Sequence, residues 1–504
     1  MTITVSHQPT GRLGEAWRMC VGTGRINLAL RADYQDSLRL TQDEIGFRYI
    51  RGHGLLSDDL GLLRQSEGLD RYNWTYLDQV FDFYLSVGIA PFIELGFMPS
   101  LLASGSETVF WWQGNITPPA QMSRWTKLVQ ALLRHLIDRY GADEVHGWPI
   151  EVWNEPNLAV FWKDADQDAY FRLYDATARA VKEVDAELMV GGPAISPGNP
   201  AWYQSFGEFV LAHGTPVDFI SGHAYSSGEA QHIPFGCYQT LEPPQWLLNQ
   251  FADPARMLAG LGDLAQLPVH ITEFNTSYRP DNPIHDTAYN AAYLAPVLAQ
   301  GGELVDSFSY WTFCDVFEES NIPTAFFHGG FGLLTHRQIR KPTYHLYSFM
   351  AQLGDEVLAS GPDHLVTRHS DGRLAILAWQ PQSGSPAGVY GSAPGDHQIS
   401  LQLPLAAGPV AMMRRRVNEQ MGNAWTAWRE LGRPMSPTLH QLDLLDEASF
   451  PLVEHCQFVA QPVDGLRLDL TLDRHEISLI ELTPVSPCNH PGLDDRRLLG
   501  QKVA

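Results

Sequence analysis

The first part of the chain alternates short apolar runs with longer stretches in which apolar residues recur at helical spacing. The short runs are rich in β-branched and aromatic residues and have the length of buried strands. There are eight of them, at residues 20–22, 47–51, 90–95, 149–154, 188–191, 219–223, 269–273 and 307–311. The pattern therefore predicts eight strands.

The stretches between these runs have the periodicity of amphipathic helices. Leu77, Val80, Phe81, Tyr84 and Leu85 fall at i, i+3, i+4, i+7 and i+8, which places them on one face of a helix. Similar spacing predicts further helices at 128–137, 170–181, 245–261, 287–300 and 344–353. Eight strand–helix units in series predict an α/β fold, a (β/α)8 TIM barrel, in which catalytic residues lie at the C-terminal ends of the strands.

The pattern changes to period-two alternation after about residue 353. Two runs flank Ser370-Asp371-Gly372, which is a hairpin signal, and residues 398–403 and 466–472 alternate apolar with polar positions. We expect a C-terminal β-sandwich accessory domain. We predict four parts. Residues 1–14 are an N-terminal segment, of which residues 2–5 pair with the accessory sheet, and residues 15–355 are the catalytic barrel. Residues 356–483 are the accessory domain, and residues 484–504 are a loosely held tail.

Composition narrows the possible functions. The 504 residues are 44% hydrophobic, which allows a large core, and 34 Lys plus Arg against 57 Asp plus Glu give a net charge of −23. This charge disfavours nucleic acid and anionic membrane surfaces as partners. The five cysteines are widely spaced without a CxxC pair, so we expect neither a disulfide framework nor a metal site. The N-terminus has no basic segment followed by an apolar one, so we expect a cytoplasmic location.

Two carboxylates stand at the ends of predicted strands. Asn154-Glu155-Pro156 ends the fourth run, and Glu273 ends the seventh. Each glutamate alone is equally compatible with an ordinary strand-end residue that faces water. Together they are the pair that glycosidic bond cleavage requires. Carboxyl groups about 5 Å apart retain the configuration at the anomeric carbon, whereas a gap of about 6.5–9.5 Å inverts it.

Several segments carry a closer resemblance. In chain order, and nearly from end to end, the sequence resembles the bacterial β-xylosidases of glycoside hydrolase family 39. The segments are Cys20-Val-Gly-Thr-Gly-Arg25, Tyr49-Ile-Arg-Gly-His-Gly-Leu55, Glu94-Leu-Gly-Phe-Met-Pro99, Phe161-Trp-Lys-Asp-Ala-Asp166, His270-Ile-Thr-Glu-Phe-Asn-Thr-Ser277, Asp306-Ser-Phe-Ser-Tyr-Trp-Thr-Phe313, Phe327-His-Gly-Gly-Phe-Gly-Leu333 and Gly432-Arg-Pro434.

The resemblance implies a role for each residue at the centre of the site. Glu155 is the expected acid/base and Glu273 the expected nucleophile. Asn154 contacts the sugar 2-hydroxyl, and Tyr225 hydrogen-bonds Glu273. Trp311 forms the floor under the sugar ring and is followed by a cis peptide bond. Strict alternation would point Asn154 and Glu155 to opposite faces, so we expect the strand to curl into its loop there.

The resemblance also implies residues around this centre. His53 and His223 contact sugar hydroxyls, with a satisfied core histidine as the alternative for each. One of Glu318 and Glu319 binds the 3- or 4-hydroxyl, and the other is expected to be solvated. Aromatic wall positions, which simple packing would also explain, are Phe110, Trp111 and Phe161. Among the rival carboxylates, Glu94 is an indirect partner of the site and Glu151 lies too deep to meet substrate.

The implied activity is that of a retaining, exo-acting β-xylosidase. It removes xylose from the non-reducing ends of xylobiose and short β-1,4-xylo-oligosaccharides through a covalent xylosyl-enzyme, and it needs no cofactor or metal. One alternative is α-L-iduronidase, whose sugar carboxylate would require a cation, for which Arg51 is the one candidate. A second alternative is an inactive carbohydrate-binding protein. The oligomeric state is left open.

Overall fold

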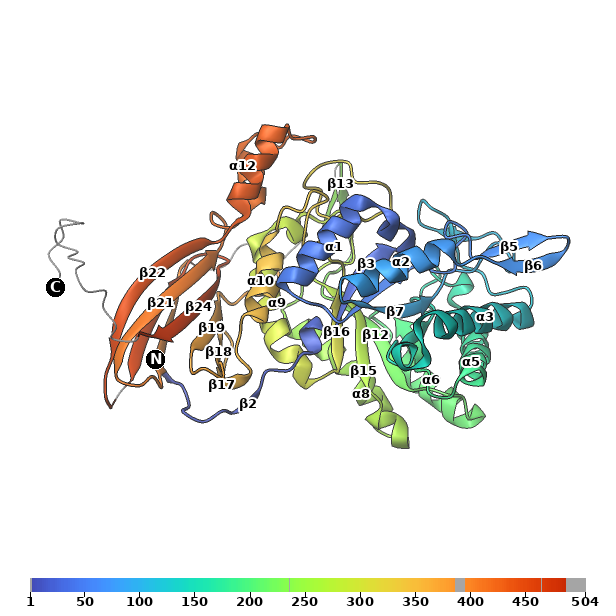
Figure 1. The fold of residues 1–504 in the computed structure, drawn as a ribbon, viewed down its shortest axis with the longest axis horizontal. Coiled ribbons are helices and arrows are strands. Elements are labelled where there is room, and N and C mark those ends of the chain that lie inside the picture. The colour runs from blue at the N-terminus through green and yellow to red at the C-terminus, as the bar shows by residue number, and fades with distance from the viewer. Residues whose placement is uncertain (1, 235, 386–394, 464, 486–504) are drawn as a thin grey trace.

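The computed structural model describes residues 2–234, 236–385, 395–463 and 465–485. Its centre is a closed barrel of eight parallel strands (Figure 1). All eight predicted runs contribute a strand, which confirms the TIM barrel. The strands are β3 (Cys20–Arg25), β4 (Tyr49–His53), β7 (Ala90–Leu95), β10 (Ile150–Val152), β11 (Val190–Ile195), β12 (Phe219–Tyr225), β15 (Val269–Asn275) and β16 (Ser307–Tyr310).

Ten α-helices in this part of the described chain lie outside the barrel. They are α1 (Ala32–Glu44), α2 (Thr75–Ser86), α3 (Met122–Tyr140), α4 (Ala142–Val145), α5 (Gln167–Val184), α6 (Ala201–His213), α7 (Gln245–Phe251), α8 (Asp253–Leu258), α9 (Ala288–Gln300) and α10 (Pro342–Ala351). No helix in the described ranges is long and apolar enough to cross a membrane.

Some helices differ from the prediction. The helix expected over 245–261 is divided into α7 and α8, and Pro254 lies in the first turn of α8, where a missing backbone N–H is tolerated. Helix α1 was not predicted because two of its four buried positions, Ser37 and Thr41, are polar. Their hydroxyls donate to helix carbonyls, so the face can be buried without being apolar.

Shorter elements decorate the loops. The hairpins are β5 (Leu63–Ser66) with β6 (Leu69–Tyr72), β8 (Thr108–Val109) with β9 (Gly114–Asn115), and β13 (Gln231–Ile233) with β14 (Gly236–Tyr238). The 3-10 helices are Ala16–Arg18, Ile26–Leu30, Lys163–Ala165, Gly262–Gln266, Pro283–Asp286 and Gly301–Glu303.

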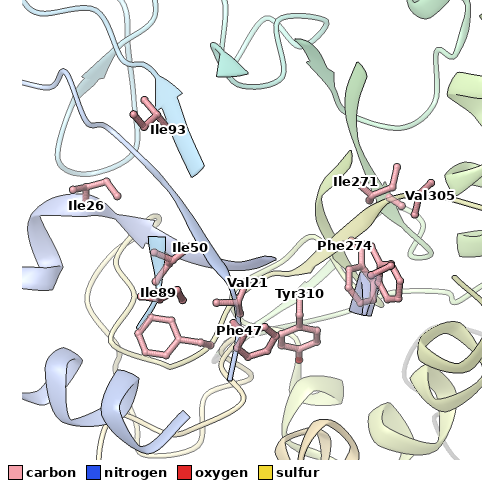
Figure 2. Close-up of a cluster of buried hydrophobic side chains, with 14 of the residues drawn as sticks. Val21, Ile26, Phe47, Ile50, Ile89, Ile93, Ile271, Phe274, Val305 and Tyr310 are labelled. Atoms are coloured by element: carbon pink, nitrogen blue, oxygen red, sulfur yellow. The ribbon is translucent and has the colours of Figure 1, made fainter. Parts of the chain in front are cut away.

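Alternation along the barrel strands separates an apolar outer face from a polar inner face. Ile50 and Ile93 belong to the apolar cluster between strands and helices, part of which Figure 2 shows. Arg51 and Glu94, the next residues along, are buried inside the barrel, where they contact each other. The barrel interior therefore collects buried charged groups close to the strand ends.

The second part of the described chain and the N-terminal strands β1 and β2 together form two further sheets. The larger has the order β2-β17-β18-β19-β24-β21-β22, and the smaller has the order β1-β20-β23. Their strands are β1 (Thr2–Thr4), β2 (Gly11–Arg12), β17 (Glu356–Ser360), β18 (His364–Arg368), β19 (Leu374–Trp379), β20 (His397–Leu403), β21 (Gly408–Val417), β22 (Leu452–Ala460), β23 (Leu466–Leu472) and β24 (Ile477–Pro484). Helices α11 (Ala424–Glu430) and α12 (Leu439–Ser449) interrupt the strands between β21 and β22.

Strand β19 in the middle of the larger sheet is buried on both faces. Leu377 and Trp379 of β19 join the main core on the barrel side, whereas Ile376 and Ala378 join the apolar cluster shared with the smaller sheet. Figure 1 places this sheet beside α9 and α10, with α12 projecting from it. The predicted domain boundaries remain a prediction, and most of the predicted tail, from residue 486 onward, lies outside the described residues.

A buried ion cluster anchors the loop between β16 and α10. The Lys341 ammonium is fully buried and lies 2.7 Å from Asp286 Oδ1 and 2.7 Å from Asp315 Oδ2. It also donates to the Gly330 carbonyl at 2.9 Å. Each aspartate accepts a second hydrogen bond from a glycine N–H of the same loop. The cluster therefore fixes the loop to the segment before α9.

We expect Lys341→Met to lower the free energy of unfolding by about 3–5 kcal/mol, because it leaves two buried carboxylates without their cation. Chemical denaturation monitored by circular dichroism measures the change. Lys163→Met is the matched control, because Lys163 pairs with Glu107 at the surface and should show no comparable loss. Equal stability of both variants would contradict a role for the cluster in stability.

Candidate active site

The end of β10 delivers the first two site residues. The strand stops at Val152, and the backbone then takes positive φ angles of 74° at Trp153 and 44° at Glu155. Residues other than glycine rarely adopt positive φ angles unless their surroundings hold the backbone in that conformation. The Glu155 N–H donates to the Ala194 carbonyl at 2.9 Å. The curl expected at this strand end is present, and it directs both Asn154 and Glu155 into the site.

Glu155 and Glu273 meet at the C-terminal end of the barrel. One oxygen of each carboxyl and a ring nitrogen of His223 all lie within 4.8 Å of one another. Both glutamates are buried, with 6% and 4% of their surface exposed. Among the described residues, these three side chains are also the one group spaced closely enough to hold a metal ion.

Arg51 is the cation at the centre of the site. Its Nε donates to Glu151 at 2.6 Å, its Nη1 to Glu273 at 2.7 Å, and its Nη2 to the side-chain oxygen Oδ1 of Asn154 at 2.9 Å. Nη2 also lies 3.1 Å from Glu94. The side chain is completely buried. Arg51 therefore compensates three buried carboxylates and orients both the expected nucleophile and Asn154.

Glu273 is held on both oxygens. Oε1 accepts from Arg51, and Oε2 accepts from the Tyr225 hydroxyl at 2.8 Å. The structure therefore brings Tyr225 to Glu273. Two donors in fixed positions leave the carboxylate one orientation within the barrel.

Glu155 occupies a different environment. Burial raises the pKa of its carboxyl to about 7. Its neighbour His223, whose Nδ1 lies 2.8 Å from Glu155 Oε1, is itself buried, and burial lowers the pKa of His223 to about 4. A neutral imidazole can accept a hydrogen bond from the protonated carboxyl or donate one to the ionised form. Glu155 can therefore exchange a proton near neutral pH.

Comparison with known proteins identifies the family of the chain. The sequence matches the model for glycosyl hydrolases family 39 over residues 1–465. The chain belongs to this family. It is 47% identical to a β-xylosidase of Geobacillus stearothermophilus over 95% of each chain. It is 25% identical to an α-L-iduronidase of Mus musculus, over 81% of this chain and 68% of that one. A crystal structure of a monomeric β-xylosidase from Caulobacter crescentus CB15 matches with a TM-score of 0.88 and 33% identity, covering 96% of this chain and all of the other.

His53 adds a second positive charge to this glycoside hydrolase site. Burial lowers its pKa, but the charge of Glu94, 2.7 Å from Nδ1, prevails and raises the pKa of His53 to about 9. Its Nε2 lies 3.7 Å from Glu273 and 3.6 Å from Glu319. Glu94 is thus an indirect partner of the site, as expected.

The two adjacent glutamates of the β16–α10 loop, Glu318 and Glu319, have different partners in the structure. We expected one of the two glutamates to be solvated. Glu318 is instead paired, because its oxygens accept hydrogen bonds from Arg25 at 2.7 Å and from Arg31 at 2.9 Å. Glu319 faces His53, and burial raises the pKa of Glu319 to about 8. Sequence alone could not make this assignment, because both arginines lie nearly 300 positions earlier.

Aromatic side chains enclose one side of the site. Trp311 is 2% exposed, its ring lies 4.7 Å from that of His53, and the peptide bond to Thr312 is cis. Phe110 stacks on His53 at 5.8 Å and contacts Phe161 at 5.6 Å. Trp111 differs, because the residue is 46% exposed and the Arg25 guanidinium lies over its ring. Phe161 therefore packs against Phe110 as part of the aromatic wall, and Trp111 is its exposed member.

Sequence reasoning missed the central role of Arg51. The residue was considered only as a partner for a substrate carboxylate. The available signal was its position in the apolar run of residues 47–51, because a charged residue inside a buried strand requires a partner.

We expect the Glu155 carboxyl to titrate near pH 7 in the free enzyme, because burial disfavours its charged form. Carbon-13 NMR of glutamate-labelled protein measures this titration, and Glu155→Gln assigns the signal by removing it. Glu319→Gln is the control that should leave the signal in place. A Glu155 signal that titrates near pH 4 would contradict the environment described here.

Proposed function

We propose that this chain is a retaining, exo-acting β-xylosidase in which Glu155 is the acid/base and Glu273 the nucleophile. The observation that carries the proposal is the approach of the two carboxyl groups, whose nearest oxygens lie within 4.8 Å. Retaining enzymes place these groups about 5–5.5 Å apart, whereas inverting enzymes leave about 6.5–9.5 Å for a water molecule. The names of the β-xylosidase relatives support the choice of sugar.

In the first step, an oxygen of Glu273 attacks the anomeric carbon and the glycosidic C–O bond breaks. Glu155 transfers its proton to the departing oxygen, which leaves as a neutral hydroxyl. In the second step, Glu155 takes a proton from a water molecule whose oxygen attacks the anomeric carbon. The bond to Glu273 then breaks and xylose leaves with its configuration retained.

The neighbouring side chains have corresponding roles in sugar binding. The side-chain oxygen Oδ1 of Asn154 already accepts a hydrogen bond from Arg51, so we assign the side-chain nitrogen Nδ2 of Asn154 as the donor to the 2-hydroxyl. His53, His223 and Glu319 are the proposed partners of the other hydroxyls. Trp311 is the proposed floor under the sugar ring. We propose Phe161 and Trp111 as contributors to the wall of the pocket.

The paired state of the arginines favours xylose over a uronic acid. A sugar carboxylate requires a cation with free donors. Arg51 gives all three of its nitrogens to protein acceptors and has no exposed surface. Arg25 and Arg31 are bound by Glu318. His53, the other cation described above, is paired with Glu94 through Nδ1, and its Nε2 faces the carboxyl groups of Glu273 and Glu319. The pocket is therefore better suited to a neutral sugar.

We expect kcat/KM for an aryl β-D-xyloside to exceed that for the matched aryl α-L-iduronide by at least about a hundredfold, because the iduronide would bury an unpaired carboxylate. Parallel initial-rate measurements with the same leaving group test this. Equal or faster turnover of the iduronide would contradict the choice of sugar. No turnover of either substrate, with binding of xylose intact, would favour an inactive carbohydrate-binding protein.

We expect the two carboxylates to respond differently to removal. Glu273→Ala should lose turnover of all xylosides, and added azide should yield the α-xylosyl azide. Glu155→Ala should lose about 10²–10⁴-fold on xylobiose but less on an aryl xyloside with a good leaving group, which needs little protonation. Azide should then yield the β-xylosyl azide.

Product configuration by proton NMR distinguishes these outcomes. Glu107→Ala removes a surface carboxylate that pairs with Lys163, and it should keep normal turnover. The same azide product from both glutamate variants would refute the division of roles.

A further inference from the structure

A cavity of about 750 Å³ lies between helix α11 and loops at the C-terminal end of the barrel. We call it the α11 cavity. Its barrel side is formed by the β13–β14 hairpin, the segment at Pro283–Asp286 and residues 324–329 of the β16–α10 loop. Its volume falls within the range of about 300–1,000 Å³ that is typical of small-molecule sites. A cavity of this size can accommodate a ligand without rearrangement of the fold.

The α11 cavity is separate from the catalytic pocket. None of its described lining residues is among the residues placed around Glu155 and Glu273 above. The two sites nevertheless share the β16–α10 loop. This loop places Glu319 beside His53, and five residues later Thr324 begins the cavity wall.

Fixed aromatic side chains form one wall. The Trp428 indole N–H donates to the Pro434 carbonyl at 2.9 Å, and its ring lies 5.5 Å from that of Phe327. Trp425, three residues earlier on the same helix, is half-buried at the cavity. One face of the Trp425 ring carries the Arg429 guanidinium, at 4.7 Å from the ring centroid. Aromatic faces beside polar groups suit ligands that are apolar on one face and hydroxylated at their edges.

Asn423 supplies an unsatisfied polar group. It lines the cavity with only 3% of its surface exposed. Its amide nitrogen donates to the carbonyls of Asn418 and Glu419, which fixes the orientation of the amide, because a carbonyl can only accept. Its Oδ1 has no hydrogen-bond partner among the described residues. Since buried acceptors in native structures are normally paired, this oxygen suits a ligand hydroxyl.

Equal numbers of arginines and carboxylates line the cavity: Arg429 and Arg433, and Glu419 and Asp286. Glu419 also contacts Arg474 and Asp286 contacts Lys341, while Arg429 lies over the Trp425 ring. A polyanion would need an excess of cations, and an apolar ligand would leave the polar groups unpaired. The combination favours a neutral ligand with many hydroxyl groups.

We propose that the α11 cavity is a second carbohydrate-binding site that takes a short xylo-oligosaccharide. The class of sugar rests on the proposed function, whereas the neutral, hydroxylated character of the ligand rests on the cavity itself. A xylo-oligosaccharide provides the apolar ring faces for the tryptophan wall and the hydroxyl donor for Asn423.

Isothermal titration of the Glu273→Gln enzyme with xylotetraose tests the proposal, because this background does not turn the ligand over. We expect two binding events per chain. Adding Trp425→Ala or Asn423→Leu should weaken one of them at least tenfold. Trp246→Ala is the matched control, because Trp246 is an exposed tryptophan on α7 away from the cavity, and it should leave both events unchanged.

Thermal melts establish that each variant is folded. If the Trp425→Ala variant does not fold, the Thr324→Trp variant is used in its place, because a tryptophan at this exposed lining position fills part of the cavity. A binding pattern that neither cavity substitution alters would overturn the proposal. Turnover of the aryl xyloside by the unmodified enzyme is measured separately. Two binding events without turnover would therefore reject the xylosidase assignment while retaining the cavity site.

Discussion

The buried guanidinium of Arg51 is the interaction on which the site depends. Three carboxylates, Glu94, Glu151 and Glu273, contact it inside the barrel, where each is almost completely buried. Burial of an unpaired carboxylate would be opposed by several kcal/mol of lost hydration, so these acids can remain buried only around a cation with several donors. Arginine meets this need better than lysine, because its planar group donates in several fixed directions. The same geometry that stabilises the interior therefore orients Glu273, the proposed nucleophile.

The two proposed catalytic glutamates have different environments, although their neighbours lie only a few ångströms apart. Glu273 contacts Arg51 directly, whereas Glu155 contacts a neutral histidine. Burial consequently dominates at Glu155 and raises its pKa to about 7. Retaining hydrolysis needs one carboxyl that can hold and release a proton, and the buried environment of Glu155 suits it to that role.

The sequence predicted features that depend on local pattern. The eight barrel strands were found because each is a short apolar run, and Asn154 and Glu155 were found because they end one of these runs. Helix α6 was missed although Trp202, Phe206 and Val210 fall on one helical face, so its signal was available. Features that depend on distant partners could not be predicted. The pairing of Glu318 with Arg25 and Arg31, which leaves Glu319 to face the pocket, is one example.

The long loop between β16 and α10 lies beside both the catalytic pocket and the α11 cavity. A segment of this length without regular structure is uncommon in a compact domain unless it carries function. Buried ions hold it at two places: Glu318 to Arg25 and Arg31, and Asp315 through Lys341 to Asp286. Between these anchors the loop presents Glu319 to the catalytic pocket and residues 324–329 to the α11 cavity. A ligand in the cavity would thus contact a segment whose two ends are fixed by charge, which gives the catalytic pocket and the cavity a common boundary.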